Sequence, residues 1–265
     1  MRSIVEPGSQ AEQVGRLLVA VFVVIALPSL PLGNYIAYPF SILTTWFHEM
    51  GHGMAALVTG QHFEQLSIYA DGSGVADSAV ASDASVFTRA AIAAGGPLGP
   101  VLAGAALILA SSRERLWRPA LWLTAGAIAV SVVLYVRASP VGFTVLPLVA
   151  AGLGLIAWKA PAGAVRFMLQ FLGMLGALSM LRDFNYLFSE EAVIGGNRIL
   201  SDTGQIESLL WLPHWVWAIV ILTVSAVIIG ASLKFALAEK PQLPRGPKPP
   251  ANVLQFKRTN DTSRR

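Results

Sequence analysis

Two histidines and a glutamate occur at a spacing that suits metal-dependent hydrolysis. His48, Glu49 and His52 form a His-Glu-Met-Gly-His pattern within TTWFHEMGHGMAA. On a helix, positions i and i+4 lie on the same face, so both imidazoles can reach one ion. Zinc lowers the pKa of a bound water toward neutrality, and a nearby carboxylate can take the proton from it. The motif therefore predicts a zinc site with His48 and His52 as ligands and Glu49 as the catalytic base.

Two imidazoles do not complete such a site, because a catalytic zinc ion usually has three protein ligands and a water. The chain contains no cysteine, so the third ligand must be His, Asp or Glu. The candidates are Asp183, Asp202, His62 and His214. Asp183 could instead pair with an arginine, and Asp202 could instead cap the helix start predicted by SDTGQ at 201–205. His62 lies in a polar loop and His214 in WLPHWVW, a stretch typical of a membrane interface, so the residues alone leave the choice open.

The composition places this motif in a membrane protein. Hydrophobic residues make up 54% of the 265 residues, charged residues only 13%, and the mean hydropathy is +0.60. Soluble domains carry roughly 25% charged residues. Apolar stretches near the ~20 residues of a membrane-crossing helix occur at about 16–33, 36–59, 90–110, 119–136, 141–158, 164–187 and 213–236. The sequence predicts an all-α polytopic membrane protein of six or seven transmembrane helices, and it excludes a soluble zinc protease.

The polar segments divide the chain. Residues 1–15 form a polar N-terminal segment, 16–238 a membrane-embedded domain, and 239–265 a basic, Pro-rich tail of the disordered type. The connection 60–89 contains LSIYADGSGVADS, which predicts a short loop or hairpin after the second helix. The third span opens AAIAAGGPLGPVLAGA, whose small residues predict either close helix packing or room for an extended substrate beside the metal.

The charges predict the orientation of the chain. From Lys240 to Arg265 there are seven Lys or Arg and one Asp, a charge of +6, whereas the whole chain carries +4. A basic tail on a near-neutral body excludes a nucleic-acid-binding face and favours contact with the lipid bilayer. The basic connections 111–118 and 159–166 fall on the side of the tail, which the excess of Lys and Arg marks as cytoplasmic. The polar connections 60–89 and 188–212 then share the opposite side, and with seven spans the N-terminus joins them.

Three stretches carry a resemblance to a known family. They are FHEMGHGMAALVTG at 47–60, GSG at 72–74 followed by AAGGPLGPVLAG at 93–104, and SDTGQIESLLWLPHWVW at 201–217. Together they resemble the site-2-protease group of intramembrane zinc metallopeptidases, most closely its small bacterial M50B-like branch. The resemblance implies a multi-pass protein of the bacterial plasma membrane whose third zinc ligand is the aspartate of Asp202-Thr203-Gly204, with Asp183 as the alternative.

The resemblance also implies the reaction. We expect a zinc-dependent intramembrane endopeptidase that hydrolyses a membrane-embedded or juxtamembrane segment of another protein. A helical substrate must unwind locally first, because helical hydrogen bonds shield its peptide groups. Two other functions fit the polar cluster, a metal-ion or proton-coupled transporter and a catalytically idle relative that binds a membrane partner. The intact Glu49 and the absence of paired interrupted helices favour the enzyme.

Overall fold

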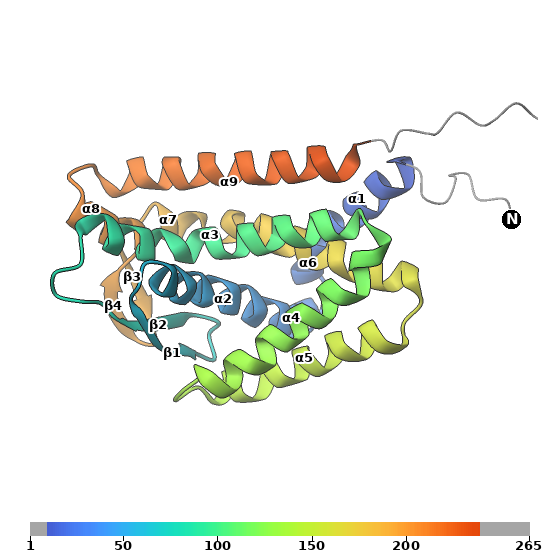
Figure 1. Ribbon diagram of the computed structural model, residues 1–265, viewed down its shortest axis with the longest axis horizontal. Coiled ribbons are helices and arrows are strands. Elements are labelled where there is room, and N and C mark those ends of the chain that lie inside the picture. Colours follow the sequence, from blue (N-terminus) through green and yellow to red (C-terminus); the bar gives the residue numbers. More distant parts are fainter. Residues whose placement is uncertain (1–9, 239–265) are drawn as a thin grey trace, which may run out of the picture.

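A computed structural model describes residues 10–238, so the tail and the first nine residues lie outside the described part of the chain. Within it, six helices are long and apolar enough to cross a membrane. They are α1 (Gln10–Ala26, continued by the short 3-10 turn η1, Leu27–Ser29), α3 (Val86–Ser111), α4 (Glu114–Leu134), α5 (Pro140–Lys159), α6 (Ala162–Arg182) and α9 (His214–Leu237). The predicted all-α polytopic membrane fold is confirmed (Figure 1).

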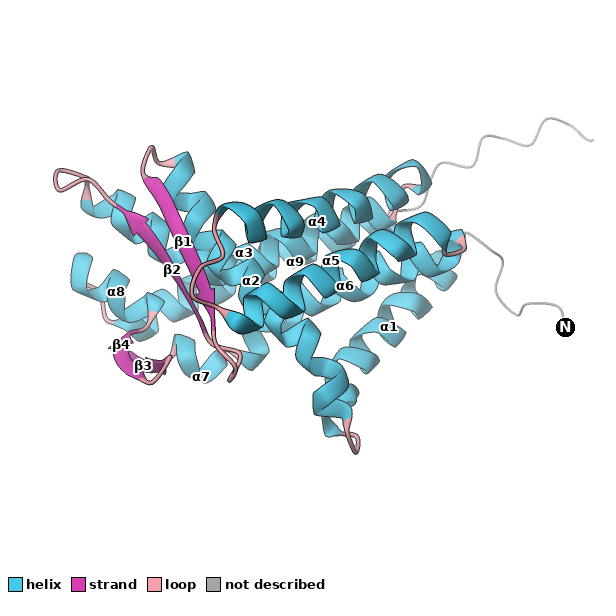
Figure 2. Ribbon diagram, turned by 90° about the horizontal axis from the view of Figure 1, so that it is seen from below, coloured by secondary structure: helices cyan, strands magenta, loops and turns pink. Residues whose placement is uncertain are grey.

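The remaining elements gather at one end of the bundle, around the C-terminal end of helix α2. Figure 2 shows two small hairpins there. Helix α2 spans Gly33–Val58. The elements around its C-terminal end are β1 (His62–Ile68), β2 (Gly74–Ala79), α7 (Phe184–Leu187), β3 (Glu191–Ile194), β4 (Asn197–Leu200) and α8 (Asp202–Leu209). The polar connections predicted to share one side, 60–89 and 188–212, therefore lie together at this end of the molecule.

Helices α1 and α2 together run once from one end of the bundle to the other. At the start of α1, the side-chain amides of Gln10 and Gln13 donate to the carbonyls of Leu237 and Ala236 at the end of α9, at 2.9 and 2.8 Å. At the other end of this pair, α2 runs into the hairpin region (Figure 1). Between them, the Pro-rich segment 27–32 turns the chain.

This arrangement corrects one prediction. Counting each apolar stretch as a full crossing placed the N-terminal end of the membrane domain opposite its C-terminal end, and that prediction is wrong. The start of α1 lies beside the end of α9. The physical reason is that proline cannot donate a helical hydrogen bond, so Pro28 and Pro31 divide a single run along the bundle into the two helices α1 and α2.

The first polar connection forms the predicted hairpin. Strands β1 and β2 pair antiparallel, from His62 opposite Ala79 to Ile68 opposite Gly74. The other edge of β1 is joined to the chain after α4, where the Leu66 N–H donates to the Tyr135 carbonyl at 2.9 Å. Strand β2 is therefore the edge strand of this sheet. The β3–β4 hairpin in the second connection was not predicted, because strands of four residues are too short to show an alternating pattern.

Small residues let the central helices approach closely. A side-chain carbon added to Gly99 on α3 would lie 2.9 Å from the Cα of Gly51 on α2. One added to Gly176 on α6 would lie 3.2 Å from the Cα of Gly104 on α3. Close backbone contact between such residues is how helices pack in lipid, where burial of apolar surface gives little drive. Most of the glycines of α3 thus serve packing, and they bring α2 and α6 together around α3.

Candidate metal centre and its cleft

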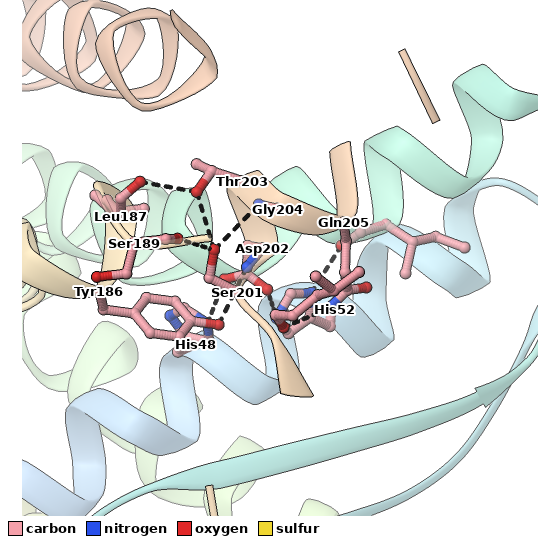
Figure 3. A network of polar contacts seen from close by, with 12 residues as sticks. His48, His52, Tyr186, Leu187, Ser189, Ser201, Asp202, Thr203, Gly204 and Gln205 are labelled. Atoms are coloured by element: carbon pink, nitrogen blue, oxygen red, sulfur yellow. Dashed lines mark hydrogen bonds and ion pairs between the residues drawn. The ribbon is translucent and has the colours of Figure 1, made fainter. Parts of the chain in front are cut away.

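The two motif histidines meet one aspartate from the far end of the chain. His48 and His52 lie one turn apart on α2, with ring centroids 5.0 Å apart. The Nε2 atom of His48 is 3.0 Å from Oδ2 of Asp202, and that of His52 is 3.2 Å from Oδ1. One ligand atom from each of the three residues lies within 4.8 Å of the other two (Figure 3). The structure therefore brings together the three groups that the sequence favoured as ligands.

The side chain of Asp202 is available because its neighbour caps the helix. The Oγ atom of Ser201 accepts a hydrogen bond from the Gly204 N–H at 3.0 Å, which makes Ser201 the N-cap of α8. The expected alternative, in which Asp202 caps the backbone, is wrong. The hydroxyl of Thr203 donates to the carbonyl of Leu187 at 2.8 Å and ties α8 to α7. With the cap supplied by Ser201, the carboxylate of Asp202 is turned toward the histidines.

A hydrogen bond fixes which nitrogen of His52 faces the centre. Its Nδ1 atom lies 2.8 Å from the carbonyl oxygen of Ile92 on α3. A carbonyl can only accept, so Nδ1 carries the proton, and Nε2 of the neutral ring presents a lone pair toward Asp202. Such a bond on the far nitrogen is the usual support of a metal-bound histidine, because it sets the ring orientation.

The donor set fits a metal ion. Asp202 is only 2% exposed, and its buried Oδ2 atom has no hydrogen-bond partner within the described residues. A buried carboxylate facing imidazole lone pairs needs a positive charge between them, since an unpaired buried charge is costly. Two imidazole nitrogens and one carboxylate match the three protein ligands of catalytic zinc sites.

Gly96 completes the floor of this site. A side-chain carbon built on Gly96 would lie 2.7 Å from Nε2 of His48 and closer still to Nε2 of His52. Only glycine therefore fits beneath the two ligand atoms. The sequence did not single out Gly96 from the packing glycines of this stretch. The signal that could have found it is the alternative prediction for the same stretch, room beside the metal.

Glu49 lies beside the three groups and is 5% exposed. The edge strand approaches it closely, since a side-chain carbon on Gly74 would lie 2.7 Å from Oε1 of Glu49. Gly74 thus lets the β2 backbone pass directly over this carboxylate, another contact that the sequence did not reveal. The predicted base and the three candidate ligands therefore occupy one site.

A cleft of about 460 Å³ opens onto this site. It lies between β2 and the β3–β4 hairpin, and its walls include Val75, Val193 and Ile199. Asp183, the alternative ligand, lines the same cleft at the end of α6 but is outside the group of three ligand atoms. Arg182 also lines the cleft, and its guanidinium donates to Ser41 Oγ at 2.8 Å.

The other two candidate ligands lie elsewhere. His62 is exposed on β1. His214 starts α9, where its N–H and its Nδ1 donate to one carboxylate oxygen of Glu207 at 2.8 and 2.7 Å. These two hydrogen bonds lower the pKa of Glu207 below its usual value. His214 therefore joins α8 to α9 and belongs to the scaffold of the site.

Comparison with known proteins agrees with the geometry. A family model described as Peptidase M50B-like matches residues 16–232, which include the motif helix and α8 with Asp202. No curated protein and no solved structure matches the chain. The matched region covers most of the chain and all four residues of the site. This integral membrane protein belongs to the peptidase M50B-like family.

Proposed function

We propose that this protein is a zinc-dependent intramembrane endopeptidase. One observation carries the proposal: His48, His52 and Asp202 converge within ligand distance of one another, with Glu49 beside them in an open cleft. The family supports a membrane metallopeptidase in general. Peptide-bond hydrolysis is the reaction that uses the base, the ligands and the cleft together.

Each residue has a distinct role in this proposal. His48, His52 and Asp202 hold the ion. Zinc, when bound, polarises the scissile carbonyl and lowers the pKa of water. Glu49 accepts a proton from the attacking water and then delivers it to the leaving amine, so that the peptide bond breaks to a carboxylate and a free amine. Gly74 has no side chain, so it leaves room for the carboxylate of Glu49 beside β2.

The cleft favours a substrate in extended conformation. Within the described residues, β2 pairs only with β1, so its other edge is free of a strand partner. Residues of β2 line the cleft beside Glu49. An extended chain can add to such an edge through backbone hydrogen bonds. We propose that a locally unwound segment of another membrane protein binds there, because an intact helix would keep its peptide groups bonded internally.

We also propose the orientation in a bacterial plasma membrane. The basic connection 111–118, the basic residues Lys159 and Arg166, and the end of α9 lie at the bundle end opposite the cleft (Figure 1). Short cytoplasmic loops carry an excess of Lys and Arg. The C-terminal tail is then cytoplasmic, and the cleft opens toward the other side of the membrane.

The variant Glu49→Gln tests the function. The amide keeps the shape of the side chain but cannot accept the proton, so cleavage of a fluorogenic single-span membrane peptide should fall about 10²–10⁴-fold or more. Bound zinc, measured by elemental analysis, should stay near one ion per chain. The matched control is Glu64→Gln, the same change at an exposed position on β1, which should cleave normally.

Two results would contradict the proposal. Cleavage by Glu49→Gln at the wild-type rate would remove the assigned base. Wild-type protein that releases its zinc on dialysis and moves the ion across proteoliposome membranes, without cleaving peptide, would favour a transporter instead.

A further inference from the structure

The side chain of Tyr186 faces the proposed metal centre, and none of the roles described above uses it. It comes from α7, the short helix after α6, and it lines the cleft. Its ring meets the ring of His48 edge-on, with centroids 6.2 Å apart and planes at 73°. Figure 3 shows its hydroxyl directed toward His48 and Asp202. A hydroxyl beside two proposed metal ligands could take part in the reaction, so its hydrogen bonds are informative.

The hydroxyl of Tyr186 is anchored by its oxygen. It accepts a hydrogen bond from the backbone N–H of Asp202 at 3.2 Å. Because that N–H approaches a lone pair, the proton of the hydroxyl must point elsewhere. Within residues 10–238, the carboxylate of Asp202 is an acceptor close to this hydroxyl, although its buried Oδ2 atom makes no hydrogen bond. When the carboxylate of Asp202 binds the ion, the O–H of Tyr186 can donate into the cleft that this side chain lines.

The surrounding elements hold this donor in place. Leu187 next to it is fully buried, and its carbonyl accepts from the Thr203 hydroxyl at 2.8 Å. The hydroxyl of Ser201 donates to the Ser189 carbonyl. The chain directly after Tyr186 is thus tied to the start of α8 by two hydrogen bonds. A donor fixed before the substrate binds does not have to reorganise during the reaction.

The position of Tyr186 complements that of Glu49. The base lies under β2, against Gly74, whereas the hydroxyl comes from α7. A tyrosine hydroxyl has an ordinary pKa of about 10, so it is a donor at neutral pH. Helix α2 thus supplies Glu49, which takes protons, and α7 supplies Tyr186, which donates a hydrogen bond.

We propose that Tyr186 is a catalytic residue that donates a hydrogen bond to the carbonyl oxygen of the scissile peptide bond as that oxygen becomes negative. This inference rests on the proposed peptidase function. When water adds to the carbonyl carbon, the C=O π electrons move to the oxygen, and the Tyr186 O–H stabilises that charge without giving up its proton. When the C–N bond breaks, the charge returns to form the new carboxyl group. A donor of this kind typically contributes 10²–10³-fold in kcat.

Tyr186→Phe isolates the hydroxyl, because the ring and its contact with His48 remain. The full zinc-loaded chain in detergent is titrated with two probes. A phosphinic peptide carries tetrahedral oxygens that imitate the charged carbonyl, and a thiol peptide of the same sequence ligates zinc through sulfur without such an oxygen. Tyr35→Phe, the same change at a side chain that is 79% exposed, is the control.

Tyr186→Phe should weaken binding of the phosphinic peptide about 100-fold and lower kcat by a similar factor. Binding of the thiol peptide, KM and zinc content should stay as in wild type and in Tyr35→Phe. Unchanged binding of the phosphinic peptide by Tyr186→Phe would overturn the role of Tyr186 and leave the peptidase proposal standing. Loss of zinc and of both probes would instead make the hydroxyl a support of Asp202. Zinc-loaded wild type that binds neither probe would refute the peptidase proposal and this role with it.

Discussion

Replacing Gly96 by alanine tests the convergence of the two histidines directly. The added Cβ would lie 2.7 Å from Nε2 of His48 and closer still to Nε2 of His52. Non-bonded heavy atoms prefer separations of about 3.5 Å or more. The His48 ring must therefore retreat by about 0.8 Å, the difference between these distances, and the His52 ring by more.

A movement of this size is incompatible with metal ligation. Metal–ligand distances vary by only about 0.2 Å around their preferred values. Changes in residues that merely support the ligands already cost about 10–100-fold in metal affinity. Because Gly96→Ala displaces two ligand atoms at once, we expect zinc affinity to fall at least about 100-fold.

The assay is competition for zinc with a chromogenic chelator, on detergent-purified protein whose helical content is checked by circular dichroism. The matched control is Gly126→Ala on α4, where an added carbon meets nothing within 4 Å. Both changes favour the helix by up to about 1 kcal/mol, so a general loss of helix cannot explain a difference between them. Wild-type zinc affinity in Gly96→Ala, with the fold intact, would refute the arrangement of His48 and His52 described above.

Two further predictions follow from the ligand set and from the topology. Asp202→Ala should lose zinc, whereas Asp183→Ala should retain it while altering the cleft, and elemental analysis of the purified proteins would show the reverse order if Asp183 were the ligand. In this cysteine-free chain, single cysteines at Ser82 and Arg198 should react with a membrane-impermeant thiol reagent from the same side of the membrane, and one at Arg113 from the other side. Labelling of the first two positions from opposite sides would contradict the shared end of the two hairpins.

The number of membrane crossings shows where local sequence becomes insufficient. Hydropathy detects an apolar stretch, but it does not state whether the stretch crosses alone. The first two predicted spans, divided at 27–32, together run once along the bundle, as the hydrogen bonding of Gln10 and Gln13 to the end of α9 shows. Those partners are distant in the chain, so no window of the sequence contains the information.

The candidate site also has one part that the sequence predicts and another part that only the structure selects. His48, Glu49 and His52 could be predicted as one candidate site from the sequence alone, because their geometry depends on one helical turn and because ionisable groups are costly among apolar residues. Asp202 was one of four open candidates on the residues alone, and the resemblance favoured it. The structure separates it from the others, because Ser201 supplies the cap and α8 packs against α3, so that the Asp202 carboxylate meets the two histidines.

The sequence by itself thus determined the membrane environment, the helical class and the half of the candidate site that lies on one helix. Tertiary structure alone placed Gly96 beneath the imidazoles, Gly74 against the base and Tyr186 beside Asp202. The physical reason is that periodicity and spacing encode contacts within one element. The meaning of a glycine or a tyrosine depends on which atoms of another element lie next to it, and only the packing of the helices decides that.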